Sequence, residues 1–160
     1  MNIQSKNNNT TYHGVEGFSA AKIDVVIHAT EDRDKILQSI ENLLAISINK
    51  FSNNCLEGHW GNRINFVRAS IDNTKEANAL AIKIIHSLNK FDRLLLLNSL
   101  DEHVDEKNNL YFRLDKQNIC KGKISLTDND AIKIRFSPIR KFGPDKTSYD
   151  YRRFLLSSIE

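Results

Sequence analysis

Residues 110–136 carry side chains that could contact the phosphates of a nucleic acid. The segment reads LYFRLDKQNICKGKISLTDNDAIKIRF, and its strand-like stretches hold the cationic and amide side chains of Arg113, Lys116, Gln117, Lys121, Lys133 and Arg135. Guanidinium and ammonium groups neutralise phosphates, and a rigid sheet would hold them at fixed spacings. The solvated face of an ordinary antiparallel sheet produces the same pattern. The pattern alone therefore favours neither interpretation.

A second segment, residues 57–62, reads EGHWGN and is predicted to form a shaped loop. Its two glycines would let a phosphate or a ribose approach the backbone closely. Two of its side chains can also donate hydrogen bonds, so the candidate nucleic-acid contacts of this loop are Gly58, His59, Gly61 and Asn62. Trp60 could stack on an unpaired base, as Tyr111 could, or could simply pack over a sheet edge.

Catalytic and metal sites are poorly represented in the sequence. There is no GxSxG, HExxH or GxxxxGK[ST] motif. Cys55 and His59 have CxxxH spacing, but a structural zinc site needs four ligands and no second pair accompanies them. We therefore predict no metal, no cofactor and no catalytic activity. A nucleic-acid enzyme using His59, Asp115 and Lys116 is an alternative, which incubation of labelled RNA with the pure protein would test.

Composition is typical of one globular domain with a hydrophobic core. The chain has 160 residues, 40% of them hydrophobic and 27% charged, and a net charge of +3. That charge permits an acidic partner without requiring one. No apolar run approaches the roughly 18 residues of a membrane span, and the N-terminus lacks the apolar core of a signal peptide. These features predict a cytoplasmic protein that does not associate with a membrane.

The elements that must position these segments do not alternate strictly between strand and helix. Strands are predicted at 18–29, 55–56, 63–71, 110–117, 121–126 and 131–136. Helices are predicted over 31–46, with Thr30 as a cap, from Asn73 or Thr74, and from near Phe91. This order favours an α+β fold: a two-layer, largely antiparallel (mixed) sheet with helices packed on one face. The last two strands are expected to form a hairpin.

Strand parity and chain composition set the expected boundaries. In the strand from Leu110, alternation turns Arg113 outward but Lys116 inward, so this strand must end or bulge at Asp115 if both are to touch RNA. Lys133 and Arg135 share the outward parity of the last strand. Residues 1–16 are predicted to be a disordered tail, 17–137 the RNA-binding domain, and 138–160 a basic tail that can form a short helix.

Three stretches together resemble a known family. They are HATEDRDKILQSIENLL, EGHWGNRINFVRASI, and NLYFRLDKQNICKGKISL with the downstream IKIRF. They are similar to the archaeal RNA-binding family described as predicted exosome subunits, whose members read HPTED, EGHYGNPI and LYLRLDKQ in the same order. The resemblance covers about Phe18–Phe136. Ala29 and Arg63 stand where the family usually or often has proline, which loosens two turns without removing a polar group.

The resemblance implies a fold like that of ribosomal protein L-five and a role in RNA processing or degradation. We therefore expect a non-catalytic RNA-binding domain whose phosphate contacts come from Arg113, Lys116, Lys121, Lys133 and Arg135. The partners expected are RNA and, by the resemblance, exosome or other RNA-processing subunits. A homodimer formed by an exposed edge strand is a further expectation. The alternative is a protein-interaction or assembly module that binds RNA only weakly.

Overall fold

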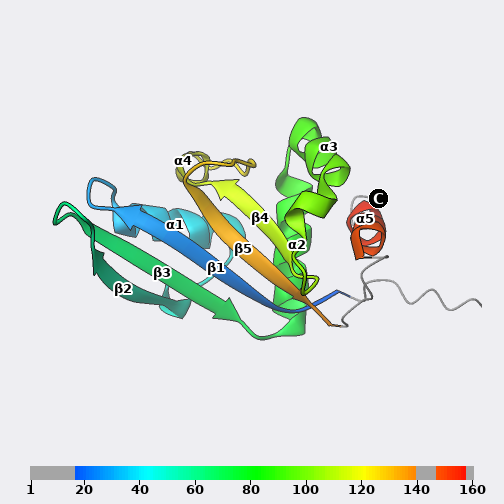
Figure 1. Cartoon of the computed structure of the whole chain (residues 1–160), viewed down its shortest axis with the longest axis horizontal. Helices are drawn as coiled ribbons and strands as arrows, with labels where there is room; N and C mark the ends of the chain where they lie inside the picture. The colour runs from blue at the N-terminus through cyan, green and yellow to red at the C-terminus, as the bar shows by residue number, and fades with distance from the viewer. Residues whose placement is uncertain (1–16, 140–146, 158–160) are drawn as a thin grey trace, which may run out of the picture.

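A five-stranded sheet organises the computed structural model, which describes residues 17–139 and 147–157 (Figure 1). Its strands are β1 (Phe18–His28), β2 (Phe51–Glu57), β3 (Arg63–Ile71), β4 (Leu110–Asp115) and β5 (Ala131–Pro138). They lie in the order β2-β3-β1-β5-β4, and every neighbouring pair is antiparallel. The predicted α+β class is confirmed, and the sheet is wholly rather than largely antiparallel.

The helices are α1 (Arg33–Leu44), α2 (Thr74–Ser87), α3 (Lys90–Asn98), α4 (Lys116–Cys120) and α5 (Thr147–Ser157), with short 3-10 turns at Ile48–Lys50 and Leu100–His103. The N-terminus of each of the helices α1, α2 and α3 is capped by a side-chain oxygen, which accepts a hydrogen bond from a backbone N–H in the first turn. Asn73, one of the two predicted candidates, caps α2, and Asn89 caps α3. The predicted cap of α1 was wrong, since Asp32 and not Thr30 accepts the N–H of Lys35.

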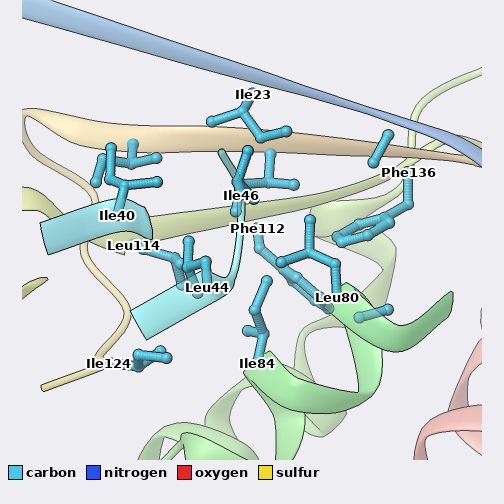
Figure 2. Close-up of a cluster of buried hydrophobic side chains, with 14 of the residues drawn as sticks. Ile23, Ile40, Leu44, Ile46, Leu80, Ile84, Phe112, Leu114, Ile124 and Phe136 are labelled. Atoms are coloured by element: carbon cyan, nitrogen blue, oxygen red, sulfur yellow. The ribbon is translucent and has the colours of Figure 1, made fainter. Parts of the chain in front are cut away.

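Alternate residues of β1, β4 and β5 and of the second half of β3 form the core under the helices. Leu110, Phe112 and Leu114 of β4 are fully buried, and Ile132, Ile134 and Phe136 of β5 are too, as parity predicted. Figure 2 shows Phe112, Leu114 and Phe136 packed with Ile40 and Leu44 of α1 and with Leu80 and Ile84 of α2. The described helices cover only this side of the sheet, so no described helix covers the other face, which we call the open face (Figure 1).

The predicted strand over 121–126 and its hairpin with the last strand were wrong. β4 ends at Asp115, whose carboxylate caps α4 by accepting the N–H of Asn118 at 2.9 Å. The N–H groups of Lys121, Gly122 and Lys123 then bond back to carbonyls of α4 at 2.9–3.0 Å, so this stretch cannot form a ladder with a strand. β5 pairs instead with β1 and β4.

The two edges of the sheet differ. The outer edge of β4 is covered, because Val104 bridges Leu110, Leu126 bridges Leu114, and the Thr127 N–H reaches the Arg113 carbonyl at 3.0 Å. No described segment pairs with the outer edge of β2. β2 is also exposed on both of its faces from its second residue onward, so the β2–β3 hairpin projects beyond the helices.

α5 lies against the beginning of β1. Tyr151 is fully buried, its ring stacks on Phe18 with centroids 5.8 Å apart, and its hydroxyl donates to the Asn108 carbonyl. Burial raises the pKa of Tyr151, and the nearby charge of Asp105 raises it further. The predicted disordered tail, residues 1–16, lies outside the described residues. No helix in the described ranges is both long and apolar enough to cross a membrane.

Candidate nucleic-acid interface

The strand register aligns outward side chains into two rows that cross the open face. One row runs Ser70, Lys22, Arg135, Tyr111 from β3 to β4. The next runs Ser52, Arg68, Asp24, Lys133, Arg113 from β2 to β4. Neighbouring strands lie about 4.8 Å apart, so these charges sit within a few ångströms of one another across the sheet. We call these two rows the basic rows; their cations are Lys22, Arg68, Arg113, Lys133 and Arg135.

Only one carboxylate stands among these five cations. Asp24 accepts two hydrogen bonds from the Arg68 guanidinium, at 2.5 and 3.2 Å, and this pairing raises the pKa of Arg68. The other four cations form no ion pair with any residue in the described ranges. A hollow of about 180 Å³ opens between the rows, lined by Lys22, Asp24, Arg68, Tyr111, Lys133 and Arg135. Every side chain that lines it carries a polar group, and four of the six are cationic, which suits an anion such as phosphate.

Tyr111 closes one end of the first row and is held in place. Its hydroxyl donates to Asp105 Oδ2 at 2.9 Å. Burial raises the pKa of Tyr111, and the Asp105 charge adds to the rise, while Arg135 opposes it. The Nε of Arg135 is buried and has no hydrogen-bond partner in the described part of the chain. Because its hydroxyl is bonded to Asp105, the ring of Tyr111 is an ordered part of the surface beside the guanidinium of Arg135.

Beyond the basic rows the open face becomes apolar towards the tip of the β2–β3 hairpin. The next two rows are Asn54, Phe66, Val26 and then Leu56, Ile64, His28. We call these the apolar rows. Phe66 lies at the junction, because the Arg68 guanidinium sits over its ring, 5.3 Å from the centroid. Leu56 is 58% exposed. The open face thus has a cationic half and an apolar half.

The predicted loop closes the hairpin as a tight turn. The Gly58 N–H donates to the Asn62 carbonyl at 2.7 Å, and the Gly61 N–H donates to the Gly58 carbonyl at 3.0 Å. Gly61 has a φ of +75°, which favours glycine at that position. His59, Gly61 and Asn62 are exposed. Trp60 at the tip is 84% exposed. The turn lies at the apolar end of the open face.

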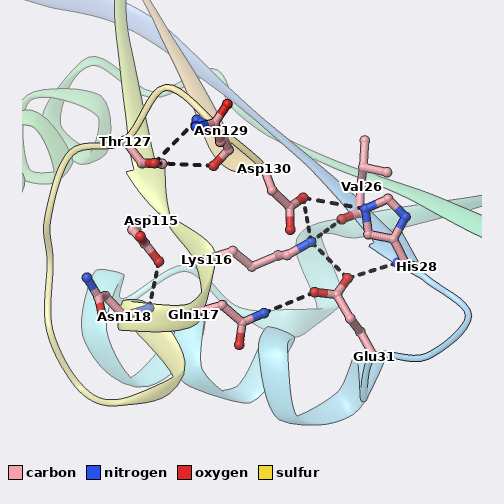
Figure 3. A network of polar contacts seen from close by, with 10 residues as sticks. All are labelled: Val26, His28, Glu31, Asp115, Lys116, Gln117, Asn118, Thr127, Asn129 and Asp130. Atoms are coloured by element: carbon pink, nitrogen blue, oxygen red, sulfur yellow. Dashed lines mark hydrogen bonds and ion pairs between the residues drawn. The ribbon is translucent and has the colours of Figure 1, made fainter.

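Lys116 has a different environment from the one we predicted for it. Its ammonium group is buried and donates to the Val26 carbonyl at 2.8 Å, to Glu31 Oε2 at 2.8 Å and to Asp130 Oδ1 at 2.9 Å (Figure 3). The β1–β5 ladder ends at Asp24 and Lys133, so the lysine satisfies a carbonyl just past its end. Because its ammonium group already donates three hydrogen bonds, Lys116 is not available to a phosphate.

The same network includes His28, whose Nε2 lies 3.5 Å from Asp130, and Gln117, whose amide donates to Glu31 Oε1 at 3.1 Å. His28, Glu31 and Asp130 are spaced closely enough to hold a cation. The lysine ammonium already contacts both carboxylates of this cluster. The cluster therefore fastens the end of β1, the start of α1 and the start of α4 together.

The structure brings together only part of the predicted site. Arg113, Lys133 and Arg135 share the open face, with the turn of Gly58, His59, Gly61 and Asn62 at its apolar end. Lys116 and Gln117 belong to the buried network. Lys121 follows α4, which packs against α1 in the helical layer. Lys22 and Arg68 escaped the sequence analysis, although the strand alternation of FSAAKIDVVIH and RINFVRASI marks both as outward.

Known proteins are similar to this chain in sequence and in fold. A family model described as RNA binding matches residues 20–137. RNA-binding protein PAB1135 of Pyrococcus abyssi is 31% identical over 129 residues, which are 75% of this chain and 84% of that protein. An uncharacterized protein of Methanocaldococcus jannaschii, MJ0213, is 30% identical over 119 residues, covering 71% of this chain and 79% of the relative.

A solved structure shows the same fold. Protein AF2318 of Archaeoglobus fulgidus, a DUF54 protein, superposes with a TM-score of 0.73 at 24% identity, over 86% of this chain and 99% of that chain. The family match spans the whole sheet and the helices α1 to α4, including both halves of the open face. This chain belongs to the RNA-binding family.

Proposed function

We propose that this chain binds RNA through its open face and does no chemistry on it. The observation that carries the proposal is the set of five cations on one helix-free sheet face, four of them without a carboxylate partner in the described ranges. Phosphates attract such groups, and their counterions are released on binding. The family match and the name of the Pyrococcus abyssi relative point the same way.

The phosphate contacts in this proposal come from Lys22, Arg113, Lys133 and Arg135, and Arg68 contributes less because Asp24 neutralises it. The hollow between the basic rows gives one phosphate several donors at once. At the hairpin turn the exposed side chains of His59 and Asn62 supply hydrogen bonds, while Gly58 and Gly61, whose N–H groups are engaged within the turn, shape it. Lys116, Gln117 and Lys121 are left out of the contact set, because the first two are engaged in the buried network and the third lies in the helical layer.

Charge reversal on the two layers tests the proposal. In the double variant Arg113→Glu with Lys133→Glu, two directly paired positions of β4 and β5 reverse sign. The matched control is Lys83→Glu with Lys123→Glu, two exposed lysines that line a hollow in the helical layer. The proposal predicts that labelled RNA loses most of its affinity for the first variant and little for the second. Equal losses, or no binding by the wild type, would rule it out.

An association with RNA-processing or exosome subunits is a second candidate function. No strand in the described ranges pairs with the outer edge of β2, which favours this candidate, since an exposed edge strand presents unpaired backbone groups that can pair with another chain. The same edge could pair two copies of this chain. Co-purification from a lysate distinguishes the first case, and sedimentation of the pure protein distinguishes the second. Loss of either association in a variant with Asn53→Pro on β2 would assign it to this edge.

A further inference from the structure

Phosphate binding accounts for the cationic half of the open face but not for its apolar half. Phosphate binding needs cations, yet Phe66, Ile64 and Leu56 continue the same face away from the cations towards the hairpin turn. Ile64, in the last of these rows, lies four residues from Arg68, which corresponds to about 14 Å along the strand. The open face therefore continues well beyond the cations.

Trp60 extends this surface into solvent. Its side chain is 84% exposed, and its ring meets the ring of His59 edge-on with centroids 5.0 Å apart. The turn that carries it is fixed by the two backbone hydrogen bonds of Gly58 and Gly61. A Cβ on Gly58 would lie 3.2 Å from the Asn62 carbonyl, so the turn leaves little room for a side chain there. The indole is therefore displayed on a rigid, projecting support.

A flat apolar surface next to a row of cations matches one kind of ligand well. An unpaired nucleotide has a flat base face beside a negatively charged phosphate, and bases stack on aromatic side chains whatever their sequence. In a duplex the base faces are already stacked, and the A-form helix offers mainly phosphates and 2′-hydroxyls. The basic rows would accept either form of RNA, whereas of the two forms only the single strand offers unpaired bases that can cover the apolar rows and Trp60.

We propose that Trp60 and the apolar rows form a stacking surface for unpaired bases, which makes single-stranded RNA the preferred ligand. This inference rests on the proposed function, since the basic rows are what hold the phosphates. In this arrangement the sugar-phosphate backbone of the RNA lies across the basic rows. The bases of the adjoining nucleotides reach the hairpin turn and stack on the indole of Trp60.

The single tryptophan of the chain gives a direct measurement. The intrinsic fluorescence of the full chain is recorded while an unlabelled, unstructured RNA of about ten nucleotides is added, and then a blunt RNA duplex of equal length. Affinity for each RNA is measured separately from the anisotropy of an end label. The inference predicts that the single strand quenches Trp60 to saturation at the concentrations where anisotropy rises. The duplex should bind more weakly and leave the fluorescence nearly unchanged.

A matched pair of variants completes the test. Trp60→Ala should weaken single-strand binding by about 5- to 150-fold, which corresponds to the loss of one stacked base, and should leave duplex binding within about twofold. Trp60→Phe should retain most of the affinity. Phe91→Ala, which removes an aromatic ring that is 73% exposed on α3, is the control and should change neither.

The outcomes separate this inference from the proposed function. If RNA binds but Trp60 is not quenched, or Trp60→Ala binds a single strand as the wild type does, the stacking surface is refuted and the basic rows stand. Equal affinity and equal quenching with duplex also refute it. If neither RNA raises the anisotropy, the proposed function fails and the inference fails with it.

Discussion

Lys116 and Lys133 carry the same charge, and the structure gives them opposite environments. Lys116 is 1% exposed and donates to one carbonyl and two carboxylates. Lys133 is exposed in the middle of the basic rows and pairs with no carboxylate among the described residues. A lysine with its acceptors in place stabilises the fold, whereas one without them is free to bind an anion.

The difference shows that the cations of one segment have to be assigned one by one, according to the groups that each of them contacts. The residues 110–136 read as one basic stretch, but the end of β4 at Asp115 splits it into an open-face part and a buried part. Burying an ammonium group is unfavourable unless hydrogen bonds and opposite charges compensate it. The variants described below test whether the two lysines are as different in energy as they are in geometry.

The largest expected effect is the loss of Lys116. Lys116→Met leaves Glu31, whose side chain is only 14% exposed, without its cation, and should lower the free energy of unfolding by about 3–5 kcal/mol. Urea denaturation measures this loss. Adding Glu31→Gln to Lys116→Met should recover part of it. Lys133→Met is the matched control and should stay within about 0.5 kcal/mol of the wild type. Equal stability of the two lysine variants would break the comparison.

A smaller effect is expected at Asp105, which supports the Tyr111 end of the basic rows. Its carboxylate accepts from the N–H groups of Lys107 and Asn109, the Asn109 amide and the Tyr111 hydroxyl at 2.9–3.0 Å. Burial alone would raise the pKa of Asp105, but these hydrogen bonds outweigh it and lower the pKa below 3.8. Asp105→Asn should cost about 1–3 kcal/mol at neutral pH.

The pH dependence of that loss has a definite direction. Because the folded pKa of Asp105 is lowered, its contribution to stability is complete above its ordinary pKa of 3.8 and is lost as the pH falls through the folded value. The stability difference between the wild type and Asp105→Asn should therefore shrink as the pH is taken below 3.8. Denaturation curves at several acidic pH values measure it. A difference that grows towards low pH would contradict the assigned hydrogen bonds.

The smallest expected effect is that of replacing Asp24, and the direction of the change in RNA affinity is what tests the comparison. Asp24→Asn removes the only carboxylate of the basic rows and frees Arg68. RNA affinity should rise, and the logarithmic salt slope should steepen by about 0.7, which is one additional single-strand phosphate contact. Stability should change little, because the ion pair between Asp24 and Arg68 is exposed to solvent. Weaker RNA binding by Asp24→Asn would mean that Arg68 does not reach the ligand.

Much of the fold follows from local patterns in the sequence. The period of two in Leu110, Phe112 and Leu114 predicted which residues of β4 face the core, and the same parity predicted that β4 ends or bulges at Asp115. The cap at Asn73 was also readable. Such features depend on neighbours a few residues away, and propensity and hydrophobic period describe them well.

The misassigned residues depend on contacts between distant parts of the chain. Glu31 lies 85 residues from Lys116, so no local pattern shows that they form an ion pair. Lys22 and Arg68 join Lys133 only because β1 lies between β3 and β5, an order that alternation within each strand does not reveal. The stretch KGKISL alternates polar and non-polar residues as a strand does, but backbone bonds to α4 hold its beginning in a turn.

The salt dependence of single-strand binding tests the central claim most directly. Four unpaired cations, Lys22, Arg113, Lys133 and Arg135, predict that the logarithm of the association constant falls with the logarithm of salt concentration at a slope of about −2.8, at about −0.7 for each phosphate contact. Lys133→Met should reduce the slope to about −2.1, and Lys83→Met should leave it unchanged. A flat dependence, or a slope that Lys133→Met does not alter, would contradict the account.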